Sequence, residues 1–194
     1  FRYEDRSFIT PISEANYQTP LLIEGEIMKS TVVFRGRRML FSEIYDGTGR
    51  LTMRMFNFAM AQHKALEEGK MIRCFGTITP GPNGKQMIHP QYQVFEKDDT
   101  IEVEKNLTPI YPTTSGLQQN KLKKIIESSL EFCDKNDLLK EESENKEYSE
   151  YGNLLETLKF LHKPPVETNL NELIEGKHPA QQSLIKEELI AHML

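Results

Sequence analysis

Alternating apolar and polar positions in the first half of the chain predict three β-strands, over residues 21–34, 38–45 and 51–56. A tight turn from Asp46 to Gly49 separates the second strand from the third, because glycine supplies the positive φ that hairpin turns need. The third strand divides its side chains between two faces. One face holds Leu51, Met53 and Met55, and the other holds Thr52, Arg54 and Phe56. A phenylalanine opposite the apolar face indicates a surface on which a ligand stacks.

A short helix and two further strands follow. Asn57 is placed to cap a helix over residues 57–68, which ends at Gly69. The apolar stripe of this helix consists of Phe58, Ala61, Ala65 and Leu66. The fourth and fifth strands are expected over residues 70–79 and 85–94, the fifth interrupted at Pro90.

The order of three strands, one helix and two strands is typical of the five-stranded Greek-key barrel of the oligonucleotide/oligosaccharide-binding (OB) fold. Few other small all-β folds place a lone helix between strands three and four. We therefore predict an all-β OB-fold barrel over residues 21–97. This fold binds ligands on its second and third strands, and on the loops that follow the first and fourth strands.

The rest of the chain divides into three segments. Residues 1–20 are mostly polar and predict an N-terminal arm, and residues 98–116 predict an extended connector broken by prolines. Residues 117–194 show helical spacing of leucine and isoleucine and predict an α-helical linker, with a charged loop over residues 140–150. The last helical pattern has no stop signal, so we expect the chain to be part of a longer protein.

Charge is distributed unevenly along the chain. Residues 1–97 carry 13 Lys and Arg against 10 Asp and Glu, whereas residues 98–194 carry 11 against 19, and the whole chain has a net charge of −5. Local rather than total charge steers a ligand. A surface that binds polyanions is therefore expected in the first half.

The candidate cations lie where an OB fold meets its ligands. Arg35, Arg37 and Arg38 fall in the first loop, Lys85 in the loop between strands four and five, and Arg54 beside Phe56 on strand three. Phosphate contact is one interpretation of these cations, and a solvated sheet edge that discourages aggregation is the other. Phe56 likewise has two interpretations: its ring stacks on a base, or it covers the mouth of the barrel.

Several other functions are disfavoured by the sequence. No apolar run approaches the roughly 20 residues of a membrane span, and the N-terminus has no signal peptide, so we expect a cytoplasmic location. The cysteines, Cys74 and Cys133, are expected to be reduced thiols. The five histidines are scattered, which disfavours a metal site. No nucleophile and base stand together, so no catalytic residue is expected.

Six ordered motifs resemble the bacterial RecG family of branched-DNA helicases. They begin at Asp46, Met53, Met87, Leu107, Leu161 and Glu175, and read DGTG, MRMFNF, MIHP, LTPIYPTTSGL, LHKPP and EGKHPAQ. The resemblance covers nearly the whole chain. It implies the wedge domain, followed by the helices that lead to an ATPase motor.

The resemblance also implies roles for particular residues. In this family the wedge splits DNA at a branch point, with an aromatic ring stacked on the junction base pair, and that position is Phe56 here. Some relatives carry a second stacking residue, a tyrosine, four positions later, where this chain departs from the pattern with Met60. Phe58 is the candidate to compensate. The cations Arg35, Arg37, Arg38, Arg54 and Lys85 would contact phosphates.

Activity, partners and location are also implied by the resemblance. The parent protein would be an ATP-dependent 3′-5′ DNA helicase of DNA repair and recombination that binds ATP and Mg²⁺ in its motor domains. The sequence contains no GxxxxGK[ST] phosphate loop, so this chain should bind no cofactor and hydrolyse nothing alone. Its partners would be replication forks, Holliday junctions, the motor domains and single-stranded-DNA-binding protein, with no membrane, at the bacterial nucleoid. The alternative is an OB-fold scaffold for protein interactions.

Overall fold

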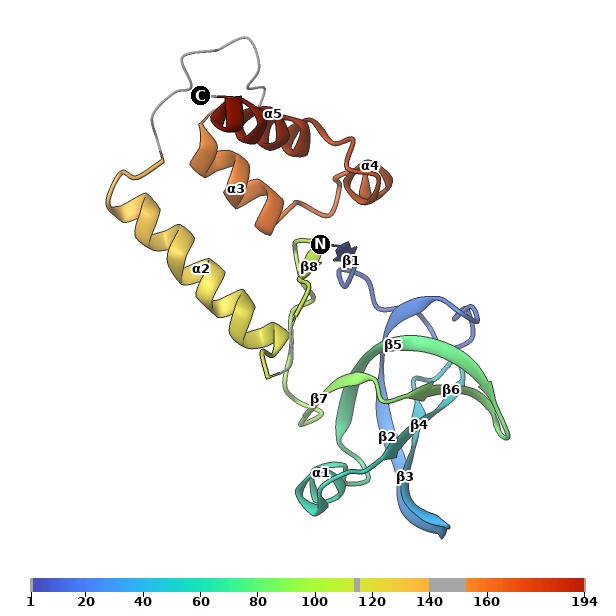
Figure 1. Ribbon diagram of the computed structural model, residues 1–194. Helices are drawn as coiled ribbons and strands as arrows, with labels where there is room; N and C mark the ends of the chain where they lie inside the picture. The colour runs from blue at the N-terminus through green and yellow to red at the C-terminus, as the bar shows by residue number, and fades with distance from the viewer. Residues whose placement is uncertain (1, 114–115, 140–152, 194) are drawn as a thin grey trace. The chain divides into compact units, whose positions relative to one another are not determined.

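The computed structural model describes residues 2–113, 116–139 and 153–193, which form two compact units (Figure 1). One unit is Phe8–Val103, and the other combines Phe1–Ser7 with Glu104–Leu194. Within these ranges no helix is long and apolar enough to cross a membrane. The predicted loop over residues 140–150 lies outside the described residues.

The unit Phe8–Val103 is built on one six-stranded sheet. Its elements are β2 (Pro20–Arg35), β3 (Arg37–Tyr45), β4 (Arg50–Phe56), α1 (Met60–Ala65), β5 (Met71–Gly81), β6 (Gly84–Ile88) and β7 (Gln91–Phe95). The strand order is β2-β3-β4-β6-β5-β7, and β2 also pairs with β5. Pairing therefore leads from β2 through β3, β4, β6 and β5 back to β2, with β7 added to β5. The β2–β3 hairpin extends beyond the rest of the sheet (Figure 1).

The alternation predicted for the third strand is confirmed in β4. Leu51, Met53 and Met55 are buried in the main core, whereas the side chains between them are partly exposed. Cys74 lies in the same core, where burial raises the pKa of its thiol to about 12. Both cysteines are free, as expected.

The hairpin between β3 and β4 is held by one carboxylate. Asp46 accepts hydrogen bonds from the backbone N–H groups of Thr48 (2.8 Å), Gly49 (2.9 Å) and Ile12 (2.7 Å). Partial burial raises the pKa of Asp46, but these donors outweigh it and hold the pKa below its ordinary value. Asp46 thus ties the segment before β2 to the hairpin.

The helix in the structure is shorter than the predicted helix over residues 57–68, and the prediction that Asn57 caps it is wrong. Asn57 has φ +52°, in the left-handed region, so it turns the chain rather than starting the helix. The helix α1 begins at Met60, and the N–H of Ala59 donates to Oε1 of Gln62 (2.9 Å). The predicted apolar stripe is also wrong, because only its ends, Phe58 and Leu66, enter the core while Ala61 and Ala65 are exposed.

The predicted fifth strand is two strands. His89 has φ +49° and Pro90 has no N–H to donate, so the ladder of β6 ends at Ile88 and β7 begins at Gln91. β6 pairs parallel with β4 and antiparallel with β5, whereas β7 pairs with β5. The backbone between β6 and β7 is thereby directed across the end of β4.

The second unit is mainly helical. Its elements are β1 (Arg2–Glu4), β8 (Thr108–Ile110), α2 (Gln119–Lys135), α3 (Leu154–His162), α4 (Leu170–Ile174) and α5 (Pro179–Met193). β1 pairs antiparallel with β8, and the hydroxyl of Tyr3 donates to the carbonyl of Leu161 (2.9 Å). The core holds Tyr3, Leu107, Leu161, Leu173 and Ala180.

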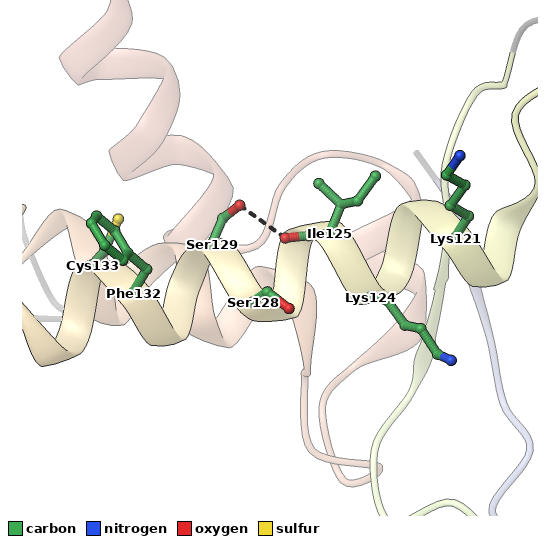
Figure 2. A pocket seen from close by; sticks show the side chains of 7 residues that line it. All are labelled: Lys121, Lys124, Ile125, Ser128, Ser129, Phe132 and Cys133. Atoms are coloured by element: carbon green, nitrogen blue, oxygen red, sulfur yellow. Dashed lines mark hydrogen bonds between the residues drawn. The ribbon is translucent and has the colours of Figure 1, made fainter.

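Helix α2 contributes no buried residue to this unit. One of its faces borders a shallow hollow lined by Lys121, Lys124, Ile125, Ser128, Ser129, Phe132 and Cys133 (Figure 2). On this face Ser129 donates to the carbonyl of Ile125 (2.8 Å), and the ring of Phe132 is 60% exposed. The helical spacing predicted for α2 is therefore present without a buried stripe.

Candidate nucleic-acid interface

Phe56 is the last residue of β4, directly opposite Met39 on β3. Its ring is partly exposed, on the face that carries Thr52 and Arg54. The guanidinium carbon of Arg37 lies 3.9 Å from the ring centroid and that of Arg54 lies 4.8 Å from it. The structure thus brings together the predicted stacking ring and two of the predicted cations.

The same face carries further contacts between cations and rings. Arg54 lies 5.4 Å from the ring centroid of Phe41, its cross-strand neighbour, and donates to Sδ of Met39 (3.3 Å). Arg50 lies 5.6 Å from the ring centroid of Tyr45 and forms an ion pair with Glu43. We call the partly exposed face formed by Phe41, Tyr45, Arg50, Arg54 and Phe56, beside the buried Met39, the outer face.

Phe58 and Met60 occupy different environments from each other. Phe58 is 9% exposed and belongs to the main core, so its position does not favour the predicted stacking role. Met60 is 51% exposed at the start of α1. Arg38 joins the two, because its guanidinium carbon lies 4.9 Å from the Phe58 ring centroid and it donates to Sδ of Met60 (2.9 Å).

The remaining two predicted cations are Arg35 and Lys85. Arg35 ends β2 and pairs with Arg37 around Gly36, which has φ +73°, while its side chain lies outside what the structure describes. Lys85 donates to the backbone carbonyls of Ile12 (2.6 Å) and Ser13 (2.9 Å). An ammonium group held in this way stabilises the segment before β2, so phosphate contact by Lys85 is not favoured.

Sequence reasoning missed two residues, one on the β2–β3 hairpin and one beside Phe56. Phe34 is 73% exposed and pairs across the hairpin with Arg38, and its place in an alternating strand was the available signal. His89 accepts a hydrogen bond at Nε2 from the N–H of Phe56 (3.1 Å). Nothing in the local sequence indicates that contact, because the two residues are 33 positions apart.

Possible metal ligands and the groups of the outer face can be compared directly. Among the described residues, no three histidine, cysteine, aspartate or glutamate side chains are grouped so that they could hold a metal ion. The outer face instead offers rings and guanidinium groups. That combination suits single-stranded or splayed nucleic acid, whose bases stack on aromatic rings while cations attract the phosphates.

Comparisons with known proteins identify relatives of this chain. The chain is 41% identical over its full 194 residues to the ATP-dependent DNA helicase RecG of Escherichia coli (strain K12), and 39% identical to that of Haemophilus influenzae. It spans 28% of the length of each of these relatives. A solved structure of RecG bound to a three-way DNA junction matches 89% of the chain and 24% of its own, with a TM-score of 0.64 and 21% identity.

The family model of the RecG wedge domain matches residues 2–133, which include the whole sheet and all eight candidate residues. The resemblance that the motifs indicated is therefore confirmed. The chain belongs to the RecG wedge domain family.

Proposed function

We propose that this chain is the DNA-binding wedge module of an ATP-dependent branched-DNA helicase, which splits strands at stalled replication forks and Holliday-type junctions. The observation that carries the proposal is the partly exposed Phe56 ring with Arg37 and Arg54 beside it. The ring stacks on the base pair at the junction, and the two cations, with Arg35 and Arg38, contact the flanking phosphates. The ring of strand pairings supports an OB-fold barrel beneath this surface.

The energies of stacking support a holding role. Opening one base-pair step costs about 1.4 kcal/mol of DNA stacking, and one aromatic side chain stacked on a base returns about 1–3 kcal/mol. A single ring can therefore keep the last pair open. Separating many pairs requires ATP-driven translocation, which belongs to the motor domains of the parent protein. Met60 is exposed four residues after Phe56 and covers a second base less effectively than a ring would.

The test compares the affinity of this chain for a three-way junction with its affinity for a plain duplex, at two salt concentrations. We expect a preference for the junction and an affinity that falls with salt, because phosphate contacts release counterions. Phe56→Ala should reduce the junction preference while leaving the fold intact. Phe8→Ala is the matched control, since Phe8 is a 66% exposed phenylalanine of the same unit.

Three outcomes would contradict the proposal. Equal or absent binding of junction and duplex would favour the OB-fold scaffold for protein interactions. Unfolding of the Phe56→Ala variant would show that the ring is part of the core, and an effect of Phe8→Ala equal to that of Phe56→Ala would show that the loss is not specific to β4.

A further inference from the structure

His89 makes two hydrogen bonds at the end of β4. Its backbone N–H donates to the carbonyl of Arg54 (2.9 Å), and its Nε2 accepts from the backbone N–H of Phe56 (3.1 Å). The rings of Phe56 and His89 also lie 5.4 Å apart with an angle of 55° between their planes. His89 therefore contacts the backbone on both sides of Met55 as well as the Phe56 ring.

The imidazole takes a place that a backbone carbonyl would ordinarily fill. β4 and β6 pair in parallel up to Arg54 and Ile88, and parallel ladders have evenly spaced hydrogen bonds. The next acceptor for the N–H of Phe56 would be the carbonyl of His89. Because His89 has φ +49° and precedes Pro90, the strand ends there and Nε2 accepts the bond instead.

We propose that His89 is a positioning residue for the junction-stacking ring, because its neutral imidazole fixes the backbone from which the Phe56 side chain projects. The inference rests on the proposed stacking of Phe56. Without this bond the last residue of β4 would lack a partner for its N–H and would be followed directly by Asn57, whose φ of +52° lies outside the strand conformation. A binding group performs best when a supporting hydrogen bond holds its orientation.

The protonation state of His89 decides whether the bond exists. Nε2 accepts a hydrogen only when the imidazole is neutral with its proton on Nδ1, because both nitrogens of a protonated imidazole are donors. The guanidinium groups of Arg54 on β4 and Arg37 on β3 lie against the Phe56 ring, which in turn contacts the His89 ring. Protonation would therefore remove the acceptor and add a third positive charge beside two cations.

The experiment measures the ratio of junction affinity to duplex affinity between roughly pH 8 and pH 5.5, the range in which histidine changes charge. It compares the unaltered chain with His89→Gln and His89→Leu. Glutamine keeps a neutral acceptor close to the place of Nε2, and leucine removes it. Neither side chain is branched at Cβ, so both share the cost of the positive φ.

At pH 8 we expect His89→Leu to lower the ratio by roughly two- to tenfold, the fold-change that corresponds to one hydrogen bond. His89→Gln should stay within about twofold of the unaltered chain. On acidification the ratio should fall for the unaltered chain and stay constant for His89→Gln, while the amide NMR signal of Phe56 shifts over the same pH range. The inference is overturned if the ratio for the unaltered chain does not change with pH. It is also overturned if the ratio rises in acid, which is the result expected of a histidine that binds phosphate.

The two proposals fail in distinguishable ways. If Phe56→Ala leaves the ratio unchanged, the stacking proposal itself is wrong. If Phe56→Ala lowers the ratio but both His89 variants have the same ratio as the unaltered chain, His89 is not a positioning residue. The stacking proposal then still stands. If His89→Leu does not fold, the pH profiles of the unaltered chain and of His89→Gln decide.

Discussion

The guanidinium carbon of Arg37 lies 3.9 Å from the centroid of the Phe56 ring, nearer than that of Arg54 at 4.8 Å. A base that stacks on the ring face covered by Arg37 must displace this group. An exposed cation–ring contact is worth about 0.5–1 kcal/mol, less than the roughly 1–3 kcal/mol of base stacking. Arg37 follows Gly36 at the exposed tip of the β2–β3 hairpin, so the displaced guanidinium can turn to a phosphate.

Arg37→Gln should therefore weaken junction binding and make it less dependent on salt. Loss of one phosphate contact is expected to reduce the slope of log affinity against log salt by about 1. The slope is measured by titrating a labelled three-way junction at several salt concentrations. Arg50→Gln is the matched control, because Arg50 lies on the same face but forms an ion pair with Glu43. Equal slope changes in the two variants would contradict the role of Arg37.

Phe34→Ala should lower junction affinity with little effect on stability. The ring is 73% exposed beside the arginines of the hairpin, so its removal should change the free energy of unfolding by no more than about 0.5 kcal/mol. A ring that stacks on a base contributes about 1–3 kcal/mol to binding. Junction titration and urea unfolding of the same variant separate the two effects, and unchanged junction affinity would show that Phe34 makes no contact with DNA.

Asp46→Ala should destabilise the unit Phe8–Val103 by about 1–3 kcal/mol, because the N–H groups of Ile12, Thr48 and Gly49 lose their acceptor. The pKa of Asp46 is held below its ordinary value, so its contribution is complete above the ordinary carboxyl pKa and is lost as the pH falls through the folded-state pKa.

Urea unfolding between roughly pH 2 and pH 5 tests the sign, since the unaltered chain should lose more stability there than Asp46→Asn. Asp98→Asn serves as the control, because Asp98 is exposed. If the Asp98 variant changed the acid profile as much as the Asp46 variant, the hairpin carboxylate would not be responsible.

The periodic spacing of apolar residues correctly predicted the features that depend on neighbouring positions in the sequence. Alternation along β4 assigned Arg54 and Phe56 to the outer face, because each step of a strand reverses the side chain. The alternation no longer assigns side chains to faces one residue beyond the strand. Asn57 turns the chain there through a positive φ, and Phe58 is buried in the core. The partners of Lys85 lie 72 and 73 positions away, so no local pattern predicts them.

Stability of the helical unit should fall as the pH drops below about 6.5, the ordinary value for histidine. Burial lowers the pKa of His162, whose Nδ1 lies 2.8 Å from the hydroxyl of Tyr111. The unfolded chain therefore binds its proton at higher pH than the folded chain, and each affected histidine costs up to about 1.4 kcal/mol per pH unit in that window. Urea unfolding followed by amide NMR signals of α3 at pH 7.5 and 5.5 measures the loss. His162→Gln should reduce this loss of stability. The part of the loss that is due to His178 should remain, because burial also lowers the pKa of that histidine. His192→Gln, at the exposed end of α5, should leave the loss unchanged.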